Sequence, residues 1–147
     1  PEITVYSPYN YRSLKSSIAA GLALEAPCAV RYPRGSEKRF NAKEIDDCFS
    51  YFGDADPEIL FITYGRIAAE CEKAAAMLKA DSLKAAVLIL TRIKPLDLKV
   101  IFEYSKTAKK IIFVEESILS GGLGEHLAAC FAQEGFNKEF IIKAVPN

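Results

Sequence analysis

The stretch ILFITYGRIAAECEKAAAMLKADSLKAAVLILTRIKPLD, residues 59–97, decides the fold. Its two unbroken apolar runs, residues 59–62 and 85–90, are too short for helices and do not alternate with polar residues. Such runs are typical of parallel strands that are buried on both faces. Apolar residues at helical spacing lie between the runs, namely Ile67, Cys71, Ala74 and Leu78. The residues of this helix expected to face water are Glu70, Glu72 and Lys73.

A strand, a helix and a parallel strand form a right-handed crossover unit, and most of the chain can be interpreted as repeating it. Short apolar runs predict further strands at residues 3–6, 28–32, 111–114 and 140–142. Ser7-Pro8 predicts the start of a helix with Ser7 as its N-cap. The residues that mark the apolar face of that helix are Leu14, Ile18 and Leu22. Later helices are predicted after Asp97, as an N-cap, and from the glycine-rich segment 121–124.

Residues 37–56 differ in character from the segments on either side. Charged residues are frequent, and Gly53-Asp54 and Asp56-Pro57 supply turn-forming pairs. A loop of about twenty residues is long for the interior of a compact domain. We therefore interpret this segment as a linker between two domains.

Composition excludes several classes of function. The chain has 147 residues, half of them apolar, and a net charge of zero, so it carries no electrostatic signal for nucleic acid or an anionic membrane. No apolar run approaches the roughly 20 residues that cross a bilayer. The four cysteines are widely spaced, which argues against a metal site or a disulfide framework and favours a reducing compartment. Because the chain begins with Pro1 and shows no signal peptide, we interpret it as a piece of a longer protein.

The first candidate site is the segment Arg31-Tyr-Pro-Arg-Gly35. Ligands of open α/β sheets bind beyond the carboxyl ends of strands, and Arg34 follows such an end. Its planar guanidinium suits a phosphate or a carboxylate. The alternative is a surface arginine in a turn, paired with a nearby acid.

The second candidate is Gly121-Gly-Leu-Gly124, whose backbone amides could approach an anion at a helix N-terminus. The spacing matches neither a dinucleotide fingerprint nor a P-loop, so Gly121 and Gly122 could equally allow a tight strand-to-helix connection. Glu115 and Glu116 precede them and could offer a carboxylate for proton transfer or for a cation of a partner. His126, the single histidine, is interpreted as a packing residue.

Four segments in this order give the chain a wider resemblance. They are Pro27-Cys-Ala-Val-Arg-Tyr-Pro-Arg-Gly35, Ile59-Leu-Phe-Ile-Thr-Tyr-Gly65, Lys94-Pro-Leu-Asp97 and Phe113-Val-Glu-Glu-Ser-Ile-Leu-Ser-Gly-Gly-Leu-Gly124. From about residue 4 to residue 142 the chain resembles the C-terminal part of the 1-deoxy-D-xylulose-5-phosphate synthases. These are thiamine-diphosphate enzymes of the transketolase superfamily, which join decarboxylated pyruvate to glyceraldehyde 3-phosphate.

The resemblance implies an organisation in domains. Residues 1–36 would be the tail of a pyrimidine-binding domain and residues 57–147 most of a transketolase C-terminal domain. The implied fold is three-layer α/β/α, with a mostly parallel five-stranded mixed sheet, one antiparallel edge strand, and a βαβ tail of the neighbouring domain before it. The implied assembly is a cytoplasmic homodimer, completed by the remainder of the same polypeptide.

The resemblance also implies roles for individual residues. By position, Arg34 binds the phosphate group of the substrate, whereas Arg31 orients the strand end or pairs with an acid. The thiamine diphosphate and Mg²⁺ site and the glutamate that activates the cofactor belong to earlier parts of the family's chain. Neither a catalytic residue nor cofactor binding is therefore expected of this piece by itself.

The sequence departs from the family at three places. Tyr9-Asn10 replaces the family's Ser-Asp, Thr91 stands where the family has an arginine, and Ser117 replaces an asparagine. Other readings thus stay open: a domain for assembly or regulation only, or the equivalent domain of a transketolase, of a 2-oxo acid dehydrogenase beta subunit or of a 2-oxo acid:ferredoxin oxidoreductase.

Overall fold

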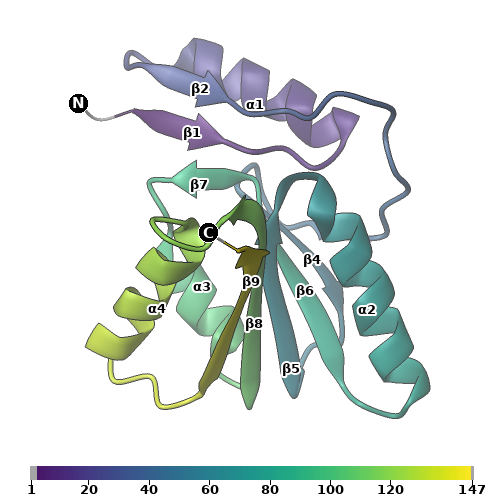
Figure 1. Ribbon diagram of the computed structural model, residues 1–147. Coiled ribbons are helices and arrows are strands. Elements are labelled where there is room, and N and C mark those ends of the chain that lie inside the picture. Colours follow the sequence, from purple (N-terminus) through teal and green to yellow (C-terminus); the bar gives the residue numbers. More distant parts are fainter. Residues whose placement is uncertain (1–2, 147) are drawn as a thin grey trace.

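A computed structural model describes residues 3–146, which form a mixed α/β structure with helices on both faces of its main sheet (Figure 1). The main sheet has the strand order β3-β4-β6-β5-β8-β9. Its strands are β3 Lys43–Glu44, β4 Phe49–Gly53, β5 Ile59–Tyr64, β6 Ala85–Leu90, β8 Lys110–Ile118 and β9 Glu139–Val145. Strands β6, β5, β8 and β9 are parallel, while β4 runs antiparallel to both β3 and β6.

The predicted crossover unit is confirmed. β5 and β6 pair in parallel from Ile59 opposite Ala85 to Tyr64 opposite Leu90, and α2 (Ala68–Ala80) connects them. All six residues of β6 are buried, because the strand lies between two neighbours and has helices or loops over both faces. This arrangement explains the absence of polar alternation in its sequence.

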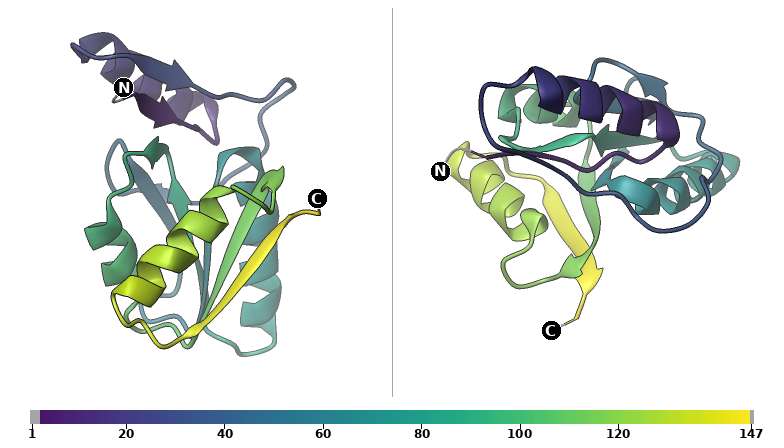
Figure 2. Two further views of the ribbon diagram at one scale, coloured as in Figure 1. Left: turned by 60° about the vertical axis from the view of Figure 1, so that its left-hand side comes forward. Right: turned by 90° about the horizontal axis from the view of Figure 1, so that it is seen from above.

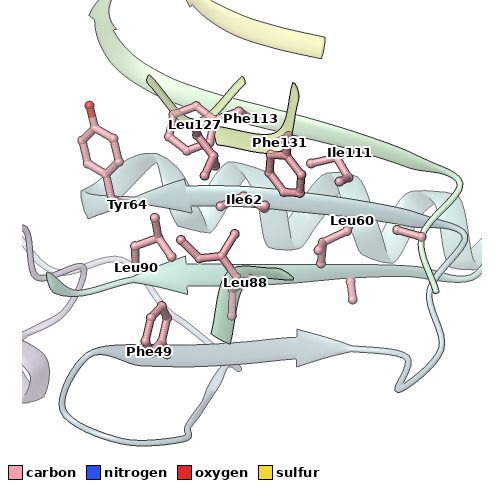
Figure 3. Packing of buried hydrophobic residues seen from close by; sticks show 13 residues of the cluster. Phe49, Leu60, Ile62, Tyr64, Leu88, Leu90, Ile111, Phe113, Leu127 and Phe131 are labelled. Carbon is pink, nitrogen blue, oxygen red and sulfur yellow. The ribbon is translucent and has the colours of Figure 1, made fainter. Parts of the chain in front are cut away.

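Successive side chains of β5 enter two different cores, one on each face of the sheet. Leu60, Ile62 and Tyr64 belong to the core beneath α3 (Leu98–Ser105) and α4 (Leu123–Gln133) (Figure 3). Phe61 packs on the opposite face against residues of α2. The layers are therefore helix, sheet and helix, as expected.

The segment 37–56 is not the extended linker that its composition predicts. Strand β4 lies within it and pairs along its whole length with β6, from Phe49 opposite Leu90 to Gly53 opposite Ala86. Phe49 is fully buried in the α3 and α4 core. The many charged residues before β4 make the segment resemble a loop in composition. The strand with which β4 pairs lies some forty residues later, so the pairing cannot be predicted locally. The sheet consequently has six strands in place of five, and the short β3 takes the edge position beside the antiparallel strand.

Glu72 also differs from expectation, since it is only 3% exposed. Its carboxylate accepts hydrogen bonds from the backbone N–H of Asn41 (2.8 Å), the Asn41 side-chain amide (3.2 Å) and the backbone N–H of Ala42 (3.0 Å). The loop before β3 covers this side of α2, so a position that helical periodicity assigns to solvent becomes buried.

The first residues of the chain form a separate unit over the carboxyl ends of the parallel strands (Figures 1 and 2). It consists of β1 (Thr4–Tyr6), α1 (Tyr11–Ala23) and β2 (Cys28–Val30), and β1 and β2 are parallel. The short β7 (Arg92–Lys94) pairs antiparallel with β1 and so joins the unit to the main body of the chain.

Helix α1 begins later than predicted and exposes its apolar face. Its N-cap is Asn10, which forms a reciprocal capping box with Ser13, in place of Ser7. The buried residues of α1 are Ser13 and Ser17, whereas Leu22 is 84% exposed. Of the residues that the apolar pattern marks for burial, Leu14 is half-buried, whereas Ile18 and Leu22 are exposed.

Candidate functional site

Two adjoining pockets lie where the N-terminal unit meets the carboxyl end of β5. One is bounded by the first turn of α1 and by the loop after β2, including Tyr11 and Arg34. The other lies between Arg31 and the end of β5. The two pockets share Tyr32, Pro33 and Arg66. Strand ends therefore converge here, as the rule for ligand sites in α/β sheets predicts.

Arg34 lies at the rim of the first pocket and is exposed. Its backbone carbonyl accepts a hydrogen bond from Nη1 of Arg66 (3.4 Å). Within residues 3–146 neither guanidinium forms an ion pair with a carboxylate. The alternative of a turn arginine paired with a nearby acid thus has no support in the geometry.

Arg31 takes part in a different contact. Its guanidinium carbon lies 5.6 Å from the centroid of the Tyr64 ring, a distance at which the cation is attracted to the aromatic face. Its backbone N–H donates to the carbonyl of Tyr6 (2.8 Å), which extends the pairing of β2 with β1. Arg31 therefore connects the N-terminal unit to the end of β5.

Glu115 is buried, with 3% exposure, and its hydrogen-bonding capacity is used inside the fold. The Tyr64 hydroxyl donates to its Oε2 (2.8 Å), and the backbone N–H groups of Leu123 (3.1 Å) and Gly124 (3.1 Å) donate to the same carboxylate. A carboxylate at the N-terminus of α4 complements the helix dipole. Glu115 is thus placed to hold the start of α4 on the sheet.

Tyr64 lies at the end of β5 with its hydroxyl pointing away from the apolar core (Figure 3). Burial raises its pKa to about 12, with a further contribution from the hydrogen bond to Glu115 and its charge; the positive charge of Arg31 acts in the opposite direction. Tyr64 is therefore a neutral hydrogen-bond donor throughout the physiological range.

The two glycines before α4 have different roles. A Cβ on Gly122 would lie 2.5 Å from Oε1 of Glu115, so this residue allows the carboxylate to approach the helix. Gly121 has a positive φ of 74°, and its N–H donates to Glu125 (2.8 Å). Because Glu115 occupies the first amides of α4, the geometry favours a tight connection over an anion-binding loop.

Glu116, a predicted candidate, and His126, for which no catalytic role is expected, both lie at the surface. Glu116 is exposed and borders the second pocket, opposite Arg31. His126 is exposed on α4, with its Nε2 3.8 Å from Sγ of Cys130 and no catalytic group beside it among the described residues. Thr91 is buried and lines a separate polar cleft with Asp46 and Asp47, so it does not reach Arg34.

Arg66 and Tyr64 are the residues of this site that sequence reasoning missed. Tyr64 closes an apolar strand, and Arg66 follows it after a single glycine. The rule that identified Arg34, a charged residue just beyond a strand's carboxyl end, would also have found Arg66.

Among the described residues, Mg²⁺, which accompanies thiamine diphosphate, has no cluster of carboxylate, histidine or cysteine side chains to hold it. Mg²⁺ requires an octahedral set of oxygen ligands. No group of three or more His, Cys, Asp or Glu side chains in residues 3–146 is arranged to hold a metal ion. Arginines dominate the charge at the two pockets, and all four cysteines are free thiols.

No described helix is both long and apolar enough to cross a membrane.

Comparison with known proteins gives relatives over nearly the whole chain. The 1-deoxy-D-xylulose-5-phosphate synthase of Heliobacterium modesticaldum is 29% identical over 139 residues, which cover 92% of this chain and 22% of that protein. The synthase of Halothermothrix orenii is 34% identical over 131 residues, 84% of this chain and 20% of that protein. This chain therefore spans about a fifth of the length of these relatives.

A solved structure shares the fold. It is described as a split gene transketolase, an inactive beta4 tetramer, and it superimposes with a TM-score of 0.81 at 20% sequence identity. The match covers 100% of this chain and 49% of that chain. Residues 53–140 also match the family described as transketolase, C-terminal domain. The chain belongs to the transketolase C-terminal domain family.

Proposed function

We propose that this chain is the C-terminal part of a thiamine-diphosphate-dependent transferase that resembles 1-deoxy-D-xylulose-5-phosphate synthase, and that Arg34 binds the phosphate group of the aldehyde substrate. The observation that carries this proposal is the position of Arg34. Arg34 lines a pocket beyond the end of β2, and its guanidinium has no carboxylate partner among the described residues. A planar guanidinium without a counter-charge suits a phosphate.

The domain assignment belongs to the same proposal. Residues 1–36 act as the tail of a pyrimidine-binding domain, whose remainder covers the apolar face of α1. The high exposure of Leu22 (84%) and Ile18 (46%) supports a covering partner. Residues 57–147 act as the C-terminal domain, with β4 of the connecting segment added to its sheet. The enzyme is a cytoplasmic homodimer in which the cofactor, Mg²⁺ and the activating glutamate are held by earlier parts of the polypeptide.

Steady-state kinetics of the full-length enzyme test the role of Arg34. We expect Arg34→Ala to raise the KM for glyceraldehyde 3-phosphate about 30-fold or more, since a charge-assisted contact to phosphate contributes roughly 2–3 kcal/mol. The KM for pyruvate should change little, because pyruvate has no phosphate. Arg39→Ala is the matched control, since Arg39 is exposed and lies outside both pockets. An equal rise in KM for both substrates would remove the phosphate role.

Titration calorimetry tests the location of the cofactor site. Residues 1–147 alone should give no heat of binding with thiamine diphosphate and Mg²⁺, because the described residues offer no ligand set for the metal. Micromolar binding by this chain would contradict the proposal.

A second candidate is a domain that serves assembly or regulation only, or the equivalent domain of a transketolase or of a 2-oxo acid dehydrogenase beta subunit. The observation that favours it is the exposed face of α1, which could contact a separate subunit as well as an upstream domain. The gene separates the two candidates. A Gly-Asp-Gly segment about thirty residues before an Asn, encoded upstream on the same chain, supports the synthase-like enzyme. The same segment on a separate subunit supports the equivalent domain of a 2-oxo acid dehydrogenase beta subunit.

A further inference from the structure

We infer that Arg66 is a second phosphate-binding residue of the Arg34 pocket and sets the preference of the enzyme for a phosphorylated aldehyde. This inference rests on the proposed function, because it assigns a second ligand to the same phosphate group. It is carried by the juxtaposition of Arg66 with Arg34 and by the charges around them.

The backbone brings Arg66 to the pocket. Gly65 turns the chain at the end of β5 with a positive φ of 65°, and its N–H donates to the carbonyl of Ser7 (3.3 Å). A Cβ on Gly65 would lie 3.2 Å from Oγ of Ser7, so glycine keeps the turn close to the chain that leads from β1 into α1. Arg66 therefore leaves β5 beside the N-terminal unit, although more than thirty residues separate it from Arg34.

Arg66 lies between the two pockets. It is the one charged residue common to their linings, together with Tyr32 and Pro33. Its Nη1 is 3.4 Å from the carbonyl oxygen of Arg34, which is long for a hydrogen bond, so this contact uses little of the guanidinium's capacity. Arg66 is exposed, and the rest of its donors are available to a ligand.

The other charged residues of the first pocket, Lys38 and Glu37, form no ion pair with Arg34 or Arg66. Lys38 forms an ion pair with Glu70 (2.6 Å), and the carboxylate of Glu37 accepts the backbone N–H of Tyr11 (2.6 Å). Arg34 and Arg66 have no carboxylate partner in the part of the chain that the structure describes. Since guanidinium groups stay protonated, the lining of this pocket includes two positive charges that no carboxylate pairs with, and such a lining suits an anion.

A phosphate monoester fits this arrangement better than a carboxylate. Each guanidinium presents a planar fork, and the three terminal oxygens of a phosphate can accept from two forks at once. A carboxylate has only two oxygens and half the charge of a phosphate dianion. The ligand class assigned to Arg66 is therefore the phosphate monoester of a small aldehyde.

The test is the ratio of kcat/KM for glyceraldehyde 3-phosphate to that for unphosphorylated glyceraldehyde in the full-length enzyme. Arg66→Ala should lower this ratio about 10-fold or more and leave the KM for pyruvate within about twofold. Arg66→Lys should restore part of the ratio because it keeps the charge and loses the fork. Arg66→Gln can still donate to the carbonyl of Arg34 but has no charge, so it should behave like Arg66→Ala.

The outcomes separate this inference from the proposed function. If Arg34→Ala lowers the ratio and Arg66→Ala does not, the inference is overturned and the role of Arg34 stands. If neither variant lowers it, both are overturned. Full recovery in Arg66→Gln would show that Arg66 only holds the loop, which also overturns the inference. If Arg66→Ala folds poorly, the kcat/KM ratios of Arg66→Gln and Arg66→Lys decide between the two roles of Arg66.

Discussion

The N-terminal unit and the main sheet are both built from strand, helix and parallel strand, yet they bury their apolar residues differently. In the main sheet, β6 is buried along its whole length, and the apolar residues of α4 enter the core. In the N-terminal unit, no residue of β2 is fully buried and Leu22 of α1 is 84% exposed. The same sequence pattern therefore specifies the local unit in both regions, whereas burial depends on how many strands and helices lie beside it.

The junction between the two regions combines polar contacts, short strand pairing and the buried ring of Tyr9, which belongs to the core on the α2 face of the main sheet. β1 pairs with β7, the N–H of Ser7 donates to the carbonyl of Thr91 (2.7 Å), and Arg31 lies over the ring of Tyr64. The loop that follows the N-terminal unit is held on α2 by Glu72. The candidate site lies at this junction, so its geometry depends on contacts that neither region has alone.

The largest expected difference in the free energy of unfolding is between alanine substitutions of one leucine from each region. Leu88→Ala should lower the free energy of unfolding by about 3–4 kcal/mol, because Leu88 has no exposed surface and its removal leaves a cavity. Leu22→Ala should change it by less than about 0.5 kcal/mol in this chain. Denaturant unfolding measures both values. A loss above about 2 kcal/mol for Leu22→Ala would mean that the face of α1 is covered, and the contrast between the regions would disappear.

The next effect concerns the loop between the regions. Glu72→Ala should cost about 2 kcal/mol, because it leaves the backbone N–H groups of Asn41 and Ala42 without their acceptor. Glu103→Ala is the matched control, since its ion pair with Lys106 is exposed and should contribute less than about 0.5 kcal/mol. Amide hydrogen exchange should locate the loss of protection at residues 41 and 42. Unchanged exchange there would make the loop independent of α2.

The smallest effect concerns Tyr64 and alkaline pH. Because its pKa is raised to about 12 by burial and by Glu115, the folded state favours the neutral phenol. This contribution to stability is present below pH 10 and is lost as the pH rises toward 12. Tyr64→Phe should therefore lose up to about 2 kcal/mol less stability than the natural chain between pH 10 and pH 12, measured by urea unfolding.

Arg31→Ala tests whether Arg31 of the N-terminal unit contacts Tyr64 of the main sheet, through the pKa of Tyr64. The positive charge of Arg31 lowers the pKa of Tyr64, so its removal should raise that pKa further, as measured by ultraviolet absorbance of the phenolate. An unchanged pKa of Tyr64 would show that Arg31 does not lie over the ring in solution. Tyr51, whose pKa is also raised to about 12, is unchanged in both variants and serves as an internal reference.

The amino-acid sequence by itself determined the crossover unit. Residues 59–62 and 85–90 are apolar without alternation because both of their faces are buried, and this property can be read within a few residues. A strand shortly before Arg34 was likewise predictable, since it needs only a short apolar run and the turn that follows, although β2 ends at Val30 and not at Tyr32 as predicted.

Only the tertiary structure decided which partners meet across long separations. It paired β4 with β6, placed Glu72 under a loop, left the apolar face of α1 exposed and brought Arg66 to Arg34. Periodicity reports which side of an element is apolar, but whether that side is covered depends on neighbours that lie thirty or more residues away. The strands and the first arginine follow from local chemistry, and the site follows from the packing of one region against the other.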